Sequence, residues 1–119
     1  MEKTIKVYQM NLEGEVDVDK MAEINRIVGQ LIKGEMYGLI LNFERVEHVN
    51  FAFLPQLIEA KKRLQSFGGD LRIAALSDYL KNIFTTTNML EQFAVFDNAQ
   101  QAAKSFGVSK AATNLPLGL

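Results

Sequence analysis

The sequence predicts a single α/β domain built on a mostly parallel four-stranded sheet, with helices alternating between the strands. Its 119 residues suffice for one hydrophobic core and are too few for two ordinary domains. Short apolar runs typical of buried strands alternate with segments whose apolar residues recur at helical spacing. This β-α-β-α-β-α-β-α order implies right-handed crossovers and a parallel sheet with helices on its faces.

The first expected strand and helix occupy the N-terminal third of the chain. Partial alternation predicts a strand over residues 4–12, which ends where the sequence becomes polar. Asp17 or Asp19 is expected to cap the helix, because a carboxylate accepts hydrogen bonds from the free N–H groups of the first turn. Gly34 is expected to end it. The apolar residues of this helix recur at helical spacing: Met21, Ile24, Ile27, Val28 and Leu31.

The middle of the chain holds the next two expected strands. Residues 37–43 form a nearly continuous apolar run, which fits a central parallel strand buried on both faces. A loop is expected over 44–49, a helix over 50–67, and a helix end at the glycines 68–69. A third strand follows at 71–76. One apolar stripe of the helix contains Phe53, Leu57, Ala60, Leu64 and Phe67.

The last third of the chain predicts two shorter helices around a short strand. Ser77 or Asp78 is expected to cap the first helix. A strand is expected over 93–96, and Asp97 is expected to cap a last helix that runs through Phe106.

These elements place one domain at residues 1–107, without internal repeats. Residues 108–119 are mostly small or polar and include Pro116. They are expected to form a flexible C-terminal tail.

The composition argues against several classes of partner. Thirteen basic residues against fourteen acidic ones give a net charge of −1, so nucleic acid, which needs a basic excess, is not an expected partner. The N-terminus lacks the apolar run of a signal peptide, and no segment approaches the length of a membrane span. We therefore expect a cytoplasmic protein without direct membrane insertion.

The residue patterns that enzymes need are missing from this sequence. His48 is the single histidine and there are no cysteines, so no metal site of that type is expected. The glycines 68–69 follow a helix, whereas a phosphate-binding loop follows a strand. The alternating acidic residues precede a helix, so capping and solubility explain them better than cation binding: Glu13, Glu15, Asp17 and Asp19. We expect no catalytic site, no metal and no cofactor.

Four motifs in the same order resemble the STAS domain, the family named for sulfate transporters and anti-sigma factor antagonists. Residues 12–17 (LEGEVD) are similar to its L-x-G-E-L-D segment, and 39–50 to the strand leading into its D-S-S-G-L motif. Residues 68–71 match its G-G-x-L step, and 75–84 resemble its x-x-S-x-x-V-x-x-x-F stretch. The resemblance spans 4–106, and the family's usual first edge strand is expected to be missing.

The resemblance implies a regulatory site that this sequence has altered. In the family, a partner kinase, which is also the anti-sigma factor, phosphorylates the second serine of D-S-S-G-L. Here Asn50 replaces the aspartate and can still cap the helix. Phe51 and Ala52 replace the serines, and Phe53 replaces the glycine. No hydroxyl stands at the family position, Ala52, so the phosphorylation switch is expected to be absent there.

The expected function is that of a non-catalytic protein-binding regulator resembling an anti-sigma factor antagonist. Its partner would be an anti-sigma-factor-like kinase or a signalling or transport assembly, and a homodimer is left open. The residues expected to contact the partner surround the altered motif: Asp17, Asn50, Phe51, Ala52, Phe53 and Ser77.

Two alternatives stay open at the sequence level. The first is a STAS adaptor or structural subunit, and the second is a small-ligand or lipid-binding domain whose pocket is lined by Phe51, Phe53 and Phe84. The phenylalanines of the motif have two interpretations. Both rings can pack inward, or Phe51, with or without Phe53, can stay at the surface as an apolar anchor for a partner.

Overall fold

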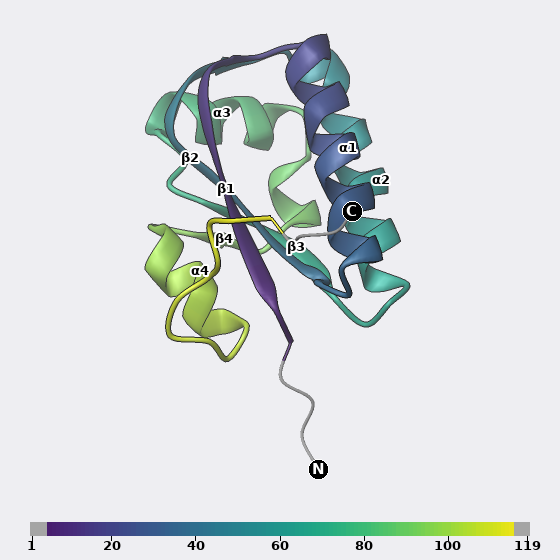
Figure 1. The fold of residues 1–119 in the computed structure, drawn as a ribbon. Coiled ribbons are helices and arrows are strands. Elements are labelled where there is room, and N and C mark those ends of the chain that lie inside the picture. The colour runs from purple at the N-terminus through teal and green to yellow at the C-terminus, as the bar shows by residue number, and fades with distance from the viewer. Residues whose placement is uncertain (1–4, 116–119) are drawn as a thin grey trace.

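The computed structural model describes residues 5–115 and confirms the predicted fold class (Figure 1). The strands are ordered β1-β2-β3-β4, and every neighbouring pair is parallel. The strands are β1 (Val7–Val16), β2 (Gly38–Val49), β3 (Asp70–Ala74) and β4 (Val95–Phe96). The helices are α1 (Val18–Lys33), α2 (Leu54–Gln65), α3 (Asp78–Thr86) and α4 (Ala99–Ser105). Two short 3₁₀ turns are η1 (Phe51–Phe53) and η2 (Leu90–Gln92).

The helices cover the two faces of the sheet unequally. Right-handed crossovers between consecutive neighbours place α1, α2 and α3 on the same face, where Leu39 and Leu41 of β2 enter the main core. The intervening Ile40 points to the opposite face and packs against Ala102 and Ala103 of α4. Because α4 has only seven residues, much of this second face is free of helix (Figure 1).

Both long strands extend beyond the expected bounds. The prediction of a loop at 44–49 is wrong, because β2 continues to Val49, and β1 continues to Val16 instead of ending at residue 12. Two register shifts each place an extra residue of β2 against β1, and in β2 the consecutive exposed residues Glu44 and Arg45 break the simple alternation that marks a strand in a sequence. Gly14 lies at one of them with a φ of 67°, a conformation that glycine adopts readily.

The predicted side-chain caps are present at the starts of α1 and α3, whereas α2 begins at Leu54 without a side-chain cap and Asn50 caps the preceding η1. Asp17 accepts a hydrogen bond from the Lys20 N–H at 3.0 Å, and Ser77 accepts one from the Leu80 N–H at 3.2 Å. The prediction of Asp97 as the last cap is wrong: the neighbouring Asn98 accepts from the Gln101 N–H at 2.8 Å. The Asn50 cap belongs to the candidate site and is described with it.

The turns at the other end of the molecule differ in detail from the expectation. Gly34 follows α1 as predicted, but the left-handed residue is Glu35, with a φ of 57°. The prediction that the second helix runs from 50 to 67 is wrong at both ends, because α2 spans Leu54–Gln65. Phe67, which was placed on its apolar stripe, is 51% exposed and stacks on Tyr37 with 5.1 Å between ring centroids. Gly69 is required there, since a Cβ would lie 1.9 Å from the Tyr37 carbonyl oxygen.

Part of the segment expected as a tail lies against β1. Ala111 is buried, and Ala112 forms a parallel bridge beside Tyr8. The Gln9 N–H donates to the Ala112 carbonyl and the Ala112 N–H donates to the Val7 carbonyl, both at 2.8 Å. Residues 116–119 lie outside the described residues. Between residues 5 and 115, no helix is long and apolar enough to cross a membrane.

Candidate functional site

The carboxyl ends of β1, β2 and β3 lead into the first turns of α1, η1 and α3 at one end of the molecule (Figure 1). Parallel strands necessarily collect these connections at one edge of the sheet, which is where α/β proteins commonly bind ligands. The structure therefore brings together the six residues that the sequence indicated: Asp17, Asn50, Phe51, Ala52, Phe53 and Ser77.

The loop after β2 is held by the residue that replaces the family's aspartate. The Asn50 N–H donates to the Val16 carbonyl at 3.1 Å, which joins the ends of β1 and β2. The Asn50 side-chain oxygen accepts from the Ala52 N–H at 3.1 Å, so Asn50 caps η1, the 3₁₀ turn that precedes α2. These two hydrogen bonds fix the backbone on which the two phenylalanines stand.

The two phenylalanines of the altered motif differ in burial. Phe51 is 62% exposed, whereas Phe53 is partly buried and packs against the main core. The proposed pocket of Phe51, Phe53 and Phe84 is wrong, because Phe84 is completely buried between Phe43 and Phe93 and has no surface to offer a ligand. Of the three rings, Phe51 is the most exposed.

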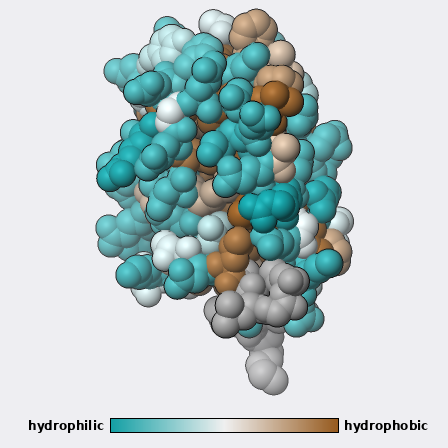
Figure 2. Space-filling view, turned by 45° about the horizontal axis from the view of Figure 1, so that its top comes forward, coloured by the Kyte–Doolittle hydropathy of each residue, from teal (hydrophilic) through white to brown (hydrophobic). Residues whose placement is uncertain are grey.

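Three further residues at this end were not expected from the sequence. Val18 and Tyr79 are 57% and 54% exposed, and each lies in the first turn of its helix, directly after the capping segment. His48, expected in a solvated loop, lies on β2, and its Nδ1 is 2.6 Å from the Tyr79 hydroxyl. Figure 2 turns this end toward the viewer and shows hydrophobic surface set among hydrophilic side chains. In the sequence, only the positions of Val18 and Tyr79 could have indicated their exposure, since a side chain in the first turn of a helix, beside the cap, often points outward.

The connection from β3 to α3 contains the least favourable backbone conformation at this end. Ala75 has a φ of 62°, which costs a residue with a Cβ about 1–2 kcal/mol. Its N–H donates to the Phe96 carbonyl at 2.9 Å, and the following Leu76 is buried. These contacts hold the chain in this conformation and leave the Ser77 cap exposed at the surface.

The side chains at this end differ from the family motif in the groups that they present. Ala52 presents a methyl group where the family has a serine, and its N–H is already bonded to Asn50. In the described part of the chain, no group of three or more acidic, histidine or cysteine side chains is placed to hold a metal ion. The exposed side chains here offer apolar contact and hydrogen bonds.

The fold and this end define a parallel α/β domain that gathers capped helix starts and exposed apolar side chains at one edge of its sheet. Comparison with known families matches residues 1–102 to the STAS domain, so the chain belongs to the STAS domain family. This confirms the resemblance seen in the sequence.

Solved structures with the same fold come from both branches of the family name. A sulfate transporter family protein from Wolinella succinogenes is 18% identical, with a TM-score of 0.74 over 88% of this chain and 89% of that one. The anti-sigma factor antagonist SpoIIAA in its unphosphorylated form is 15% identical, with a TM-score of 0.71 over 92% and 96%. An anti-sigma-factor antagonist domain protein from Planctomyces limnophilus is 14% identical, with a TM-score of 0.67 over 83% and 89%. At these identities the likeness concerns the fold.

Proposed function

We propose that this STAS domain is a non-catalytic regulator that binds a protein partner through the end of the sheet around Phe51, without a serine phosphorylation switch. The observation that carries the proposal is the pairing of an exposed Phe51 with an Ala52 that has no hydroxyl, at the position of the family's regulatory motif. Both side chains stand on a backbone fixed by Asn50.

The surface has the composition of a protein interface. Aromatic side chains are enriched at the centre of such interfaces, and polar groups surround them. Phe51, Val18 and Tyr79 supply the apolar contacts, while Asp17 and Ser77 supply polar groups nearby. The caps and the His48–Tyr79 hydrogen bond restrain these side chains before binding, which lowers the entropy lost on association.

The missing hydroxyl supports a binding mode that is not controlled at this position. SpoIIAA has been solved in forms described as phosphorylated and unphosphorylated. A phosphate at a helix start adds negative charge and hydrogen-bond acceptors that change docking. Ala52 accepts no phosphate, so binding through this surface would be constitutive or controlled elsewhere.

Two kinds of partner are proposed. An anti-sigma-factor-like kinase would follow from the likeness to the anti-sigma factor antagonists. A transport assembly, in which this chain acts as an adaptor subunit, is favoured by the likeness to the Wolinella protein and to a SulP transporter STAS domain from Vibrio cholerae. Either partner would bind the surface around Phe51, so identifying the bound partner distinguishes the regulator from the adaptor.

The experiment is an affinity capture from a lysate of the native host, with captured proteins identified by mass spectrometry. Wild type is compared with Phe51→Glu and with Phe67→Glu, a matched control because both rings are about half exposed or more and lie at opposite ends of α2. A kinase-fold protein lost only with Phe51→Glu supports the regulator, and transport proteins lost in the same way support the adaptor. Partners retained by both variants would refute docking at this surface.

A further inference from the structure

The outer edge of β1 has open hydrogen-bonding groups. β1 is the first strand in the sheet order and pairs with β2 on its inner side. Backbone groups of alternate residues point to the same side of a strand. Val7 and Gln9 use their outward groups to bind Ala112, and side-chain burial keeps alternating along β1 through Glu13, so the outward groups further along belong to Asn11 and Glu13. Within residues 5–115, nothing outside the β1–β2 ladder bonds the N–H of Asn11 or Glu13.

The chain itself shows that this edge accepts an added strand. Ala112 lies parallel to β1 and makes two hydrogen bonds of 2.8 Å with it. Further along, Leu115 packs against the core cluster shared with α1, so the described C-terminal segment leaves the edge after a single bridge. Figure 1 shows this segment, in yellow, crossing beside β1 at mid-height. An extended segment from another molecule can continue the same line of pairing at Asn11 and Glu13.

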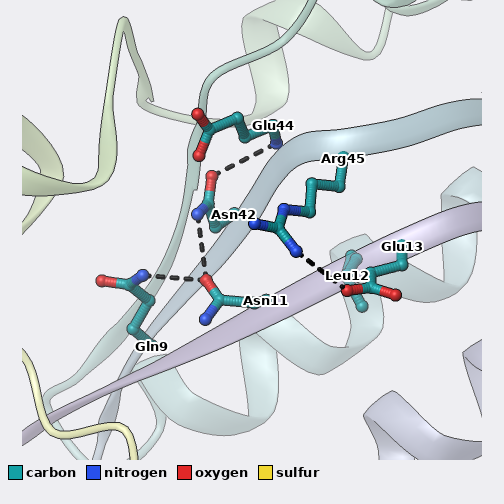
Figure 3. Close-up of a pocket in the computed structure, with 7 residues that line it drawn as sticks. All are labelled: Gln9, Asn11, Leu12, Glu13, Asn42, Glu44 and Arg45. Carbon is teal, nitrogen blue, oxygen red and sulfur yellow. Dashed lines mark hydrogen bonds and ion pairs between the residues drawn. The ribbon is translucent and has the colours of Figure 1, made fainter.

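A hollow of about 320 Å³ lies beside this edge, on the face that α4 leaves open (Figure 3). Asn11 accepts hydrogen bonds from the Asn42 and Gln9 side chains at 2.9 and 2.8 Å, and this row of amides forms the floor. Glu13 and Glu44 also line the hollow. Glu13 faces Arg45 at 3.5 Å, in a pair whose two side chains are 69% and 75% exposed, so solvent screens it strongly.

The charge near the edge indicates which occupant fits. Exposed carboxylates outnumber the one exposed cation on this part of β1 and β2; these carboxylates are Glu13, Glu15, Glu44 and Glu47. In a symmetric pair of β1 edges, the same acidic residues would face one another, and like charges opposite each other destabilise a sheet. An extended segment with basic side chains is complementary both to the edge and to the carboxylates of the hollow.

We propose that the outer edge of β1 binds an extended basic segment of a partner protein by strand addition at Asn11 and Glu13. Backbone hydrogen bonds to these two residues supply the pairing, and a basic side chain of the added strand lies over the hollow beside Glu13 and Glu44. This surface is separate from the one around Phe51, so a partner can engage both, or two partners can bind together.

The test uses short synthetic peptides and the isotope-labelled protein. A peptide that alternates lysine with valine is expected to shift the amide signals of residues 9–13 and to slow the solvent exchange of the Asn11 and Glu13 amides. N-methylation of the peptide at alternate residues, which removes the pairing donors, is expected to weaken binding about tenfold. A peptide that alternates glutamate with valine is expected not to bind.

Two protein variants separate backbone pairing from side-chain contact. Asn11→Pro removes the N–H that points away from β2 and leaves the hydrogen bonds between β1 and β2 intact. This variant should therefore lose peptide binding and the slowed exchange of the Glu13 amide. Asn11→Ala keeps the N–H and should retain most of the affinity. The N-methylated peptide gives the same information should Asn11→Pro fail to fold.

Three results would overturn the proposal. The first is equal affinity of the methylated and unmethylated peptides. The second is a set of shifted signals confined to the Phe51 end, or no shifts at all. The third is a dimer that protects the same amides without peptide, detected by sedimentation equilibrium, which would assign the edge to a second copy of the chain.

Discussion

Replacing Phe51 by alanine separates binding from folding, because most of this side chain is accessible. A phenylalanine side chain exposes about 200 Å² when fully accessible, so the 62% that remains exposed corresponds to about 120 Å². At about 25 cal/mol per Å², complete burial of that area in an interface is worth about 3 kcal/mol. Association costs and incomplete burial reduce this figure, and we expect the dissociation constant to rise at least about tenfold.

The assay is titration calorimetry of the captured partner against wild type, Phe51→Ala and the control Phe67→Ala. Denaturant unfolding of the same proteins checks that Phe51→Ala changes the free energy of unfolding by no more than about 0.5 kcal/mol, as expected of an exposed residue. Equal partner affinity for Phe51→Ala and wild type would refute the assignment of Phe51 as an anchor. An equal loss with Phe67→Ala would show that the effect is not local.

The remaining predictions concern stability and are checked by denaturant or thermal unfolding. Phe53→Ala should lower the free energy of unfolding by about 2 kcal/mol, since Phe53 packs against the core, and an unchanged value would contradict that packing. Ala75→Gly should raise it by about 1 kcal/mol by relieving the left-handed conformation, and a decrease would contradict this account of the turn. Gly69→Ala should lower it by about 3 kcal/mol or more because of the close Tyr37 carbonyl, and wild-type stability would show that the turn can open. Burial raises the pKa of Tyr8 above its ordinary value of 10.0, so the folded state keeps that proton at a pH where the unfolded chain loses it. Stability should therefore fall as the pH rises past 10.0, less steeply in Tyr8→Phe than in wild type, and identical slopes would contradict the shift.

The parts of the fold that depend on local patterns could be predicted from the sequence. The apolar run at the start of β2 and the helical spacing in α1 each report burial directly. The extension of β1 was obscured by the polar stretch at residues 13–15, and that of β2 by register shifts that break the alternation of its own side chains. The pairing of Ala112 with β1 could not be predicted either, because a single sequence contains no pattern that reports contacts between distant segments.

In the candidate site, too, features set by neighbouring residues could be predicted, and features set by packing could not. Asn50 was expected to cap because its side chain bonds to an amide only two residues away. Phe51 and Phe53 are equally apolar and only two residues apart, and the direction of each ring depends on how η1 sits on the core. The contact between His48 and Tyr79 joins β2 to α3, so it required the packed structure.

Docking of a partner around Phe51 can be mapped residue by residue from the chemical-shift changes of the isotope-labelled domain on adding its captured partner. We expect the largest changes at Val18, Phe51, Ala52 and Tyr79, together with slowed amide exchange around η1. Changes that leave these residues untouched and fall instead on α4 or on the turn at Phe67 would contradict it.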